Sequence, residues 1–417
     1  MANWWPWMLM AVVVASGALV GPSPTSPPTR PTTLVEAVTS PPTTVDPALA
    51  RTLGERTVAA NVFQTLLTPS PDGVAPGLAQ SWEVSGNVVT LHLNPQARLT
   101  NGQPLTAATV AQALARPLWP SVASLPAKEL LGLVVGSDQV ARGGARTLSG
   151  VVALDAKTVA ITLKNPPADP TAFLRGLAQE ALAVVPPDDL VQGGPNWQLT
   201  NLWGSGGWQL ESWQLHSSLA FRSSLPGVSW EVKVEDFSSP ALAAASIANN
   251  LAQVWSLEPS TLSALSTSEL ARVHFVPDRQ ELVWSARLPG AGAVVVPVQS
   301  LARAAFRDTV PVDGMPANVT APPGVLAVEA DDPWAVALGQ AIAAQSRGAL
   351  VMQKWTAGTP LPQGTTAYLG PDPSAFPSGV NQPLMREGGL FMWSSAISGV
   401  GVFPNGLLNW AQVTFRP

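Results

Sequence analysis

The sequence predicts a fold of mixed α/β or α+β class. Segments in which apolar and polar residues alternate, as in strands, are interspersed with segments of helical periodicity, and neither kind forms a long uniform run. Hydrophobic residues make up 46% of the 417, which is enough to build sizeable cores. Because single cores stop growing at roughly 250–300 residues, this length predicts two or three domains.

The element order follows from the periodicity and from turn residues. A weak strand is expected at 34–38, and a β-hairpin at 82–93 around the Gly/Asn turn at 85–87. Two short strands are expected within 151–163. Further strands are predicted at 208–213, 219–221, 229–234 and 411–415. Helices are predicted at 51–67, 106–115, 168–179 and 239–251.

Residues 1–20 are expected to be an export signal or an uncleaved membrane anchor. The run from Trp4 to Val20 is almost entirely apolar, and small residues at 15–18 suit a cleavage site. No Lys or Arg precedes the run, whose length is close to the roughly 17–25 residues that span a bilayer. Signal, anchor and buried N-terminal helix therefore all stay open. Residues 21–32, rich in Pro, Ser and Thr, are expected to be an extended linker.

Composition excludes several classes of function. A net charge of −5 without a basic run argues against a nucleic-acid partner. The absence of cysteine excludes disulfides, thiolate metal sites and a lipid-modified N-terminal cysteine. His92, His216 and His274 are scattered, and no P-loop or G-x-S-x-G motif occurs, so neither an enzyme nor a cofactor is expected. The adjacent acids Asp331 and Asp332 are interpreted as an exposed helix start or turn.

Two neighbouring blocks are the most specific signal in the chain. The first reads P-G-L-A-Q-S-W-E at 76–83, and the second reads N-G-Q-P-L-T-A at 101–107. Shorter motifs accompany them in a fixed order: P-T-T-V-D-P at 42–47, N-V-F-Q-T-L-L at 61–67, G-V and D-A-K-T-V within 150–159, G-S-G-G-W at 204–208, G-P-D-P at 370–373, and S-G-V at 398–400 before Gly406 and Trp410. Together they resemble the bacterial extracellular solute-binding proteins of the oligopeptide/dipeptide type, family 5. The resemblance covers 33–240 well and 365–417 loosely.

The resemblance implies a two-lobed fold of the type II periplasmic-binding-protein kind, with the ligand cleft between the lobes. Lobe I would comprise 33–240, including an extra subdomain at about 58–165. Lobe II would comprise 241–370, and 371–417 would return to close lobe I.

The implied function is that of the substrate-binding protein of an ABC importer. Such a protein captures a peptide or peptide-like solute and delivers it to permease subunits in the membrane. The resemblance implies an exported monomer in the periplasm or at the extracellular face of the cytoplasmic membrane. The alternative is a degenerate binding-protein fold that acts as a ligand sensor or as a surface scaffold without transport.

The sequence departs from the family at the ligand loop. Peptide-binding members place an acidic residue three positions before the Asp-Pro pair, where it meets the peptide's α-ammonium. The matching position is Leu369, which implies that a free peptide N-terminus is not held in the usual way. Asp372 is a candidate substitute, although its ordinary role would be to make the turn before Pro373.

Tryptophans supply the remaining candidates. There are 16 of them against the single tyrosine, Tyr368, and large flat side chains suit apolar, aromatic or cationic ligands as well as cores. The resemblance places Trp208, Trp213, Trp393 and Trp410 in segments that flank the cleft. The predicted ligand-binding residues are Trp208, Gly206, Tyr368, Leu369, Asp372 and Trp393.

Overall fold

The computed structural model describes residues 33–70, 73–167, 170–186, 197–198, 202–287, 293–312, 314–330, 332–355, 361–370, 376 and 380–416, without the side chains of 125–126, 278–281 and 386. The predicted signal or anchor (1–20) and linker (21–32) therefore lie outside the described residues. Within the ranges described, no helix is both long enough and apolar enough to cross a membrane.

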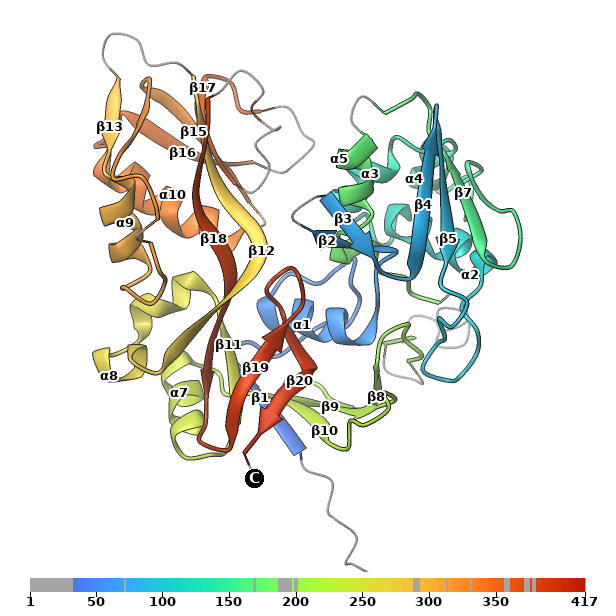
Figure 1. Ribbon diagram of the computed structural model, residues 1–417, viewed down its shortest axis with the longest axis horizontal. Coiled ribbons are helices and arrows are strands. Elements are labelled where there is room, and N and C mark those ends of the chain that lie inside the picture. Colours follow the sequence, from blue (N-terminus) through green and yellow to red (C-terminus); the bar gives the residue numbers. More distant parts are fainter. Residues whose placement is uncertain are drawn as a thin grey trace, which may run out of the picture.

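A mixed sheet of ten strands runs through the molecule, in the order β16-β15-β17-β12-β18-β11-β1-β10-β9-β8 (Figure 1). β1 pairs in parallel with β10 and β11, and β15 pairs in parallel with β16 and β17. The other pairs in this sheet are antiparallel. The strands are β1 Thr33–Val38, β8 Trp208–Gln214, β9 Ser218–Ser223, β10 Glu231–Asp236, β11 Val254–Leu257, β12 Val273–Ala286, β15 Gly324–Glu329, β16 Leu350–Trp355, β17 Thr365–Gly370 and β18 Val380–Trp393.

The antiparallel ribbon β12–β18 is the longest pairing in this sheet, and each of its strands has 14 residues. One end of the ribbon pairs with β17, and the other end pairs with β11. The register shifts after Pro277, which has no N–H to donate to a ladder. Opposite that point, a Cβ on Gly388 would lie 2.3 Å from the carbonyl oxygen of Val276, so only glycine permits this close approach.

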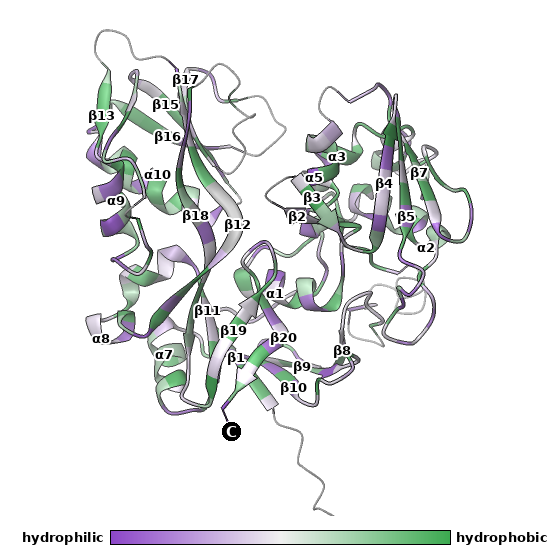
Figure 2. Cartoon of the chain, in the orientation of Figure 1, coloured by the Kyte–Doolittle hydropathy of each residue, from purple (hydrophilic) through white to green (hydrophobic). Residues whose placement is uncertain are grey.

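We define lobe II as the part of the chain packed around β12 and β15–β18. Its helices lie on the left in Figure 1, mostly on the side of the sheet that is turned away from the rest of the molecule. Figure 2 shows apolar residues concentrated in α10 and the neighbouring strands, whereas α9 also carries hydrophilic ones. Ser239 caps α7 and Asp332 caps α10, each followed by a proline. The elements are α7 Pro240–Ala248, η4 Pro259–Ala264, α8 Thr267–Leu270, α9 Val298–Ala305 and α10 Pro333–Gln345, with the small pair β13 Val294–Val296 and β14 Val319–Ala321.

We define lobe I as the rest of the described chain. It has two hydrophobic cores, of which the first surrounds Trp410. The indole of Trp410 meets Trp208 edge-on, with ring centroids 5.5 Å apart, and lies 5.0 Å from the ring of Phe221. This core packs α1 (Leu53–Val62) and the hairpin β19–β20 (Ile397–Val402 and Leu408–Phe415) against β8–β10. Tryptophan thus supplies core volume in lobe I.

A carboxyl group is buried within this first core. Trp410 Nε1 donates to Glu36 Oε2 at 2.6 Å, and Ser256 Oγ donates to Glu36 Oε1 at 3.1 Å. Burial raises the pKa of Glu36 to about 7, against the lowering effect of these two hydrogen bonds. Each oxygen therefore has a partner, as a buried polar group requires.

The second core of lobe I belongs to a small four-stranded sheet, in the order β4-β5-β7-β6. The predicted hairpin is confirmed, since β4 and β5 pair around Gly86, which has a φ of 59°. The predicted cap Thr106 accepts a hydrogen bond from the backbone N–H of Thr109 and starts α2. The elements are β2 Leu67–Ser70, β3 Gly73–Pro76, β4 Ala79–Ser85, β5 Val88–Leu93, α2 Ala107–Ala113, η1 Arg116–Leu118, α3 Leu125–Leu131, α4 Ser137–Ala141, β6 Val151–Ala153, β7 Thr158–Thr162, α5 Pro170–Gly176 and η2 Glu180–Leu182.

The predicted helix at 51–67 was too long. The helix ends at Val62, and Phe63 adopts an extended conformation as its C-cap. Tertiary packing explains the earlier end of the helix. Phe63 packs in the first core of lobe I, whereas Leu66 and Leu67 pack in the second. The chain must leave the helix to pass from one core to the other, which local periodicity does not reveal.

A buried ion pair joins the two cores of lobe I. Arg116 Nη1 donates to Asp46 Oδ2 at 2.6 Å, and Nη2 donates to Oδ1; the two side chains are 3% and 2% exposed. The guanidinium also lies 5.6 Å from the ring centroid of Trp197. Asp46 is the acid of the P-T-T-V-D-P motif, so this motif has a structural role.

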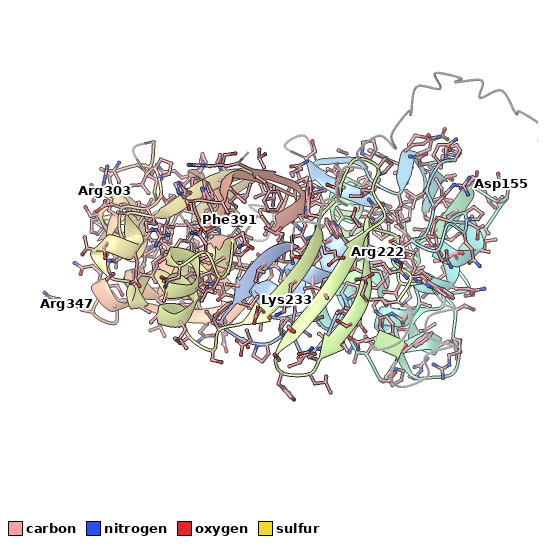
Figure 3. The ribbon with its side chains drawn as sticks, turned by 90° about the horizontal axis from the view of Figure 1, so that it is seen from below. Asp155, Arg222, Lys233, Arg303, Arg347 and Phe391 are labelled. Carbon is pink, nitrogen blue, oxygen red and sulfur yellow. The ribbon has the colours of Figure 1, made fainter. Side chains whose placement is uncertain are left out.

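Arg116→Met should destabilise the chain by about 3–5 kcal/mol, because it leaves the Asp46 carboxylate buried without its partner. Unfolding by guanidinium chloride measures the loss. The matched control is Arg222→Met, whose ion pair with Glu211 is exposed and should contribute less than about 1 kcal/mol. Figure 3 shows Arg222 on the outer surface of the sheet. Equal losses in the two variants would contradict a structural role for the buried pair.

Candidate functional site

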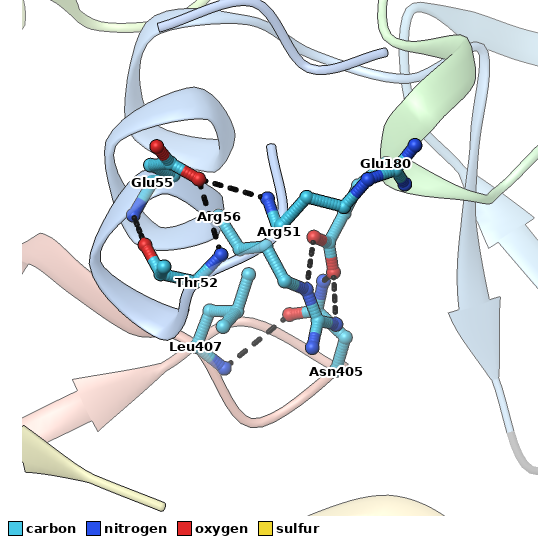
Figure 4. Close-up of polar contacts among 7 residues, drawn as sticks. All are labelled: Arg51, Thr52, Glu55, Arg56, Glu180, Asn405 and Leu407. Atoms are coloured by element: carbon cyan, nitrogen blue, oxygen red, sulfur yellow. Dashed lines mark hydrogen bonds and ion pairs between the residues drawn. The ribbon is translucent and has the colours of Figure 1, made fainter. Parts of the chain in front are cut away.

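The first turn of α1 lies near the place where the two lobes meet (Figure 1). Thr52 Oγ1 accepts from the backbone N–H of Glu55, and the Glu55 carboxylate accepts from the N–H groups of Arg51 and Thr52 at 2.9 and 3.1 Å (Figure 4). Burial raises the pKa of Glu55, but hydrogen bonds from Thr43, Arg51 and Thr52 outweigh it and lower the pKa overall. This capping box fixes the start of α1 and therefore the position of the next residue, Arg56.

Arg56 belongs to a polar cluster that joins three distant segments. Its Nε and Nη2 donate to Glu180 Oε2 and Oε1 at 2.9 and 3.0 Å, which is a bidentate pair. Asn405, in the turn between β19 and β20, donates to the same Glu180 Oε1 at 2.6 Å (Figure 4). The Arg56 side chain is 30% exposed, so the cluster reaches the surface of lobe I.

Lobe II contributes a buried pair of carboxyl groups, Asp332 and Glu387, which are 6% and 4% exposed. Asp332 Oδ1 accepts from the N–H groups of Trp334 and Ala335 at 2.8 and 3.1 Å, so it caps α10. Among the described residues, the carboxyl of Glu387 is the neighbour that acts on the rest of this carboxyl group, and no other donor reaches its Oδ2. Asp332 does lie at a helix start, as predicted, but the prediction that it is exposed was wrong, because it is buried beside Glu387.

The pKa of Asp332, in lobe II, depends in part on a charge in lobe I. Burial raises its pKa to about 6, and hydrogen bonds from Ala335, Trp334 and Glu387 oppose this rise. The positive charge of Arg56 also lowers the pKa, although Arg56 belongs to lobe I. An electrostatic interaction therefore acts between the first turn of α1 and the first turn of α10.

The ends of β15 and β17 hold the third polar group. Tyr368 is fully buried, and its hydroxyl donates to Glu329 Oε2 at 2.7 Å. The indole of Trp355, at the end of β16, meets the tyrosine ring edge-on with centroids 5.8 Å apart. Glu329 itself is partly exposed. The tyrosine thus holds a carboxylate at the carboxyl end of the sheet in lobe II.

The structure places the predicted ligand residues in different parts of the fold. Trp208 is 1% exposed in the first core of lobe I, and Gly206 donates its N–H to the carbonyl of Val62 at 2.8 Å. Tyr368 and Leu369 are neighbours on β17, where both are fully buried. Trp393 stacks on His274 with ring centroids 3.8 Å apart.

Asp372, the sixth predicted ligand residue, lies outside the described residues. Of the six predicted residues, Tyr368 and Leu369 lie together on β17, and Gly206 and Trp208 are close to each other in the sequence. Five residues of these polar groups were not predicted from the sequence: Arg56, Glu180, Asn405, Glu329 and Glu387. No local motif marks them, because their partners are far apart in the sequence.

Asp332→Asn should stabilise the chain increasingly as the pH rises from about 4 to 6. A folded-state pKa of about 6, above the ordinary 3.8, means that protonated Asp332 favours the folded state. This contribution is complete below pH 3.8 and is lost as the pH rises through 6, so the variant should gain up to about 3 kcal/mol at pH 8. Asparagine keeps the helix cap. Chemical unfolding as a function of pH measures the gain.

In a chain that already carries Arg56→Gln, Asp332→Asn should give a larger gain in stability than it gives in the wild type. Arg56 lowers the pKa of Asp332, so without this arginine more stability is lost when Asp332 ionises. Asp155→Asn is the matched control. There the backbone N–H of Lys157 donates to the carboxylate at 2.7 Å and lowers the pKa, so the control should give no gain as the pH rises. A gain from Asp332→Asn that does not depend on pH would contradict the account.

Comparison with known proteins finds similarity to bacterial solute-binding proteins over part of the sequence. Residues 73–224 match the family model described as "Bacterial extracellular solute-binding proteins, family 5 Middle". The periplasmic oligopeptide-binding protein OppA of Escherichia coli is 29% identical over 185 residues, which are 43% of this chain and 34% of the relative. OppA of Salmonella typhimurium is 29% identical over 180 residues, or 42% of this chain and 33% of the relative. The matched stretch thus spans about a third of each curated relative.

Solved structures share the fold over almost the whole chain. The murein tripeptide-binding protein MppA of Escherichia coli has a TM-score of 0.57 at 15% identity, covering 92% of this chain and 98% of MppA. OppA of Haemophilus influenzae, in complex with the peptide RPPGFSPFR, has a TM-score of 0.55 at 16% identity, covering 92% and 99%. An unliganded open form of MppA gives 0.61 at 15% identity, with coverage of 92% and 97%. The protein therefore has the two-lobed fold seen in the periplasmic peptide-binding proteins, and its residues 73–224 match the model of the bacterial extracellular solute-binding proteins, family 5.

Proposed function

We propose that the protein is the extracellular solute-binding component of an ABC importer. It captures a peptide or peptide-like solute between lobes I and II and delivers it to a membrane permease. We further infer that it acts outside the cytoplasmic membrane, as a monomer, and that it performs no catalysis. The family match over 73–224 and the fold similarity to peptide-binding proteins support this proposal.

The observation that carries the proposal is the joining of the lobes by the ribbon β12–β18. Lobe I and lobe II have separate hydrophobic cores, and the ribbon's two ends are hydrogen-bonded to β17 in lobe II and to β11. A continuous ribbon with a register shift near its middle can bend without breaking either core. Such a joint permits hinge closure around a ligand.

The charged groups near the joint give the closed and open states different energies. The positive charge of Arg56 on lobe I already acts on the carboxyl of Asp332 on lobe II. A solute stabilises the closed state only through its differential affinity for that state. We therefore expect closure to strengthen this interaction as water leaves the space between the lobes.

We propose the division given by the sequence: lobe I from 33 to 240 with its extra subdomain, lobe II from 241 to 370, and a return to lobe I from 371 to 417. Within that return, β18 first packs with lobe II as one strand of the ribbon and then leads back to lobe I. The predicted ligand contacts also remain proposals. They are Gly206, Trp208, Tyr368, Leu369, Asp372 and Trp393.

Thermal unfolding of the full chain in the presence of defined peptides tests the proposed function. A mixture of tri- to pentapeptides should raise the free energy of unfolding, because a ligand that binds only the folded state stabilises it by mass action. At a concentration one hundred times Kd the gain is about 2.7 kcal/mol. Free amino acids at the same total concentration are the control and should give a smaller gain. If no peptide stabilises the chain, it is not a peptide receptor.

A further inference from the structure

A pocket lies between the ribbon β12–β18 and the loop that follows α9, and we call it the outer pocket. Its volume is about 640 Å³, within the roughly 300–1,000 Å³ of small-molecule sites. In Figure 1, α9 and this loop lie on the left of the ribbon, whereas lobe I lies on the right. The outer pocket is therefore separate from the space between the lobes. Its described lining on the ribbon side is Phe275, Pro277, Pro383, Leu384 and Met385.

Two irregularities of the ribbon shape this wall. Met385 pairs with one residue of β12 and Pro383 pairs with the next, so Leu384 between them is the extra residue of a β-bulge. Successive residues of a regular strand point to opposite faces, but Leu384 and Met385 both pack in the core of lobe II. The other register shift begins at Pro277. The outer pocket thus lies where the ribbon departs from regular pairing.

The opposite wall is a loop that is held in one shape. It leaves α9 through Arg307 and Asp308, whose φ angles of 51° and 56° are rarely adopted by residues other than glycine. The side-chain amide of Gln299, on α9, donates to the carbonyls of Val312 and Met315 at 3.1 and 3.4 Å. Backbone that is strained in this way is concentrated at functional sites. The loop contributes Pro311, Gly314 and Met315 to the pocket.

The lining of the outer pocket favours an apolar ligand. Its described side chains are hydrocarbon, aromatic or thioether groups, and the three prolines among them have no N–H group to donate. A charged or strongly polar ligand group placed against this wall would lose hydrogen bonds to water without replacement. The side chains of Met315 and Met385, by contrast, are flexible and polarizable and adapt to ligands of different shape. An uncharged, largely apolar small molecule matches this lining.

An occupant of the outer pocket would also act on the ribbon. One wall belongs to the ribbon at its irregular points, whereas the other wall is fixed to α9 by Gln299. When the ribbon bends there, the two walls shift relative to each other and the pocket changes shape. A ligand then has different affinities for the open and the closed state, and it shifts the equilibrium between them.

We propose that the outer pocket is a second binding site, which takes a small uncharged apolar molecule and couples its binding to the movement of the lobes. The coupling rests on the proposed function, whereas the existence of the site does not. Coupling between two sites is reciprocal. A solute bound between the lobes therefore changes the affinity of the outer pocket for the apolar molecule.

Fluorescence titration of the full chain with N-phenyl-1-naphthylamine tests the site, because this uncharged probe emits strongly only in apolar surroundings. The wild type should bind the probe saturably, and Gly314→Trp should weaken binding at least about tenfold by filling the pocket. Gly314 is exposed, and a Cβ added there meets no atom within 4 Å, so this variant should fold. Pro311→Glu, at the other exposed lining residue, should also weaken binding because it adds a charge to the apolar wall.

Gly399→Trp, on β19, is the matched control. A Cβ added at Gly399 also meets nothing within 4 Å, and this residue does not line the outer pocket. The control should bind the probe as the wild type does. Thermal unfolding of each variant confirms that it is folded.

Repeating the titration in the presence of the tri- to pentapeptide mixture tests the coupling. Saturating peptide should change the Kd of the probe at least about fivefold. The change should reach a plateau as the peptide concentration rises, because the coupling between two separate sites is finite. Direct competition for one site would instead raise the Kd of the probe without limit.

Four results would overturn the proposal. A wild type that does not bind the probe would show that there is no apolar site, and equal binding by the wild type, Gly314→Trp and Pro311→Glu would place the probe elsewhere. A Kd that rises without limit would show that peptide enters the outer pocket, and a Kd that peptide leaves unchanged would show no coupling. If the peptide mixture does not stabilise the chain, the proposed function fails and the coupling fails with it, while the probe titration still decides whether the site exists.

Discussion

The antiparallel pairing of β12 with β18 is the constraint on which the rest of the structure depends. Each strand has 14 residues, and together they pass from the sheet of lobe II to the strands β11 and β1, which lie beside the first core of lobe I. Because each lobe has its own hydrophobic core, this ribbon and its neighbours fix how the lobes face one another. The irregular register near Pro277 gives the ribbon a place to bend.

The same ribbon sets where chemistry can occur. It borders β17, whose carboxyl end carries Tyr368 and Gly370, and it includes Glu387, which pairs with Asp332 at the start of α10. On the lobe I side, the turn of the hairpin β19–β20 contacts the ribbon, since a Cβ on Gly389 would meet the carbonyl of Gly406 at 2.5 Å. That turn also carries Asn405, a partner of the cluster around Arg56.

Local sequence signals predicted the parts of the fold that depend on local chemistry. The hairpin at 79–93 follows from alternation around Gly86, and α2 follows from its threonine cap. The resemblance to binding proteins also implied the two-lobed fold correctly. The end of α1 was beyond local prediction, because two cores compete for successive residues there.

The candidate site was harder to predict, for a physical reason. Glu180 lies 124 residues from Arg56 and 225 from Asn405 in the sequence. From the sequence alone, each of these three residues is indistinguishable from an ordinary surface residue. Glu329 and Tyr368 meet only because β15 and β17 pair in parallel. Tryptophan, conversely, was an ambiguous signal. The buried indole of Trp208 packs against Trp410, a role that a large apolar side chain fills equally well in a core.

We propose that the two lobes close around a solute by bending at the ribbon β12–β18. The chain contains no cysteine, so spin labels can be placed specifically at two introduced cysteines, Asp155→Cys in lobe I and Arg303→Cys in lobe II. Both positions are exposed, and they lie at opposite ends of the molecule (Figure 3). Double electron–electron resonance measures the distance between them. If the lobes close, the distance distribution becomes shorter and narrower when peptide is added. An unchanged distribution at saturating peptide would contradict closure.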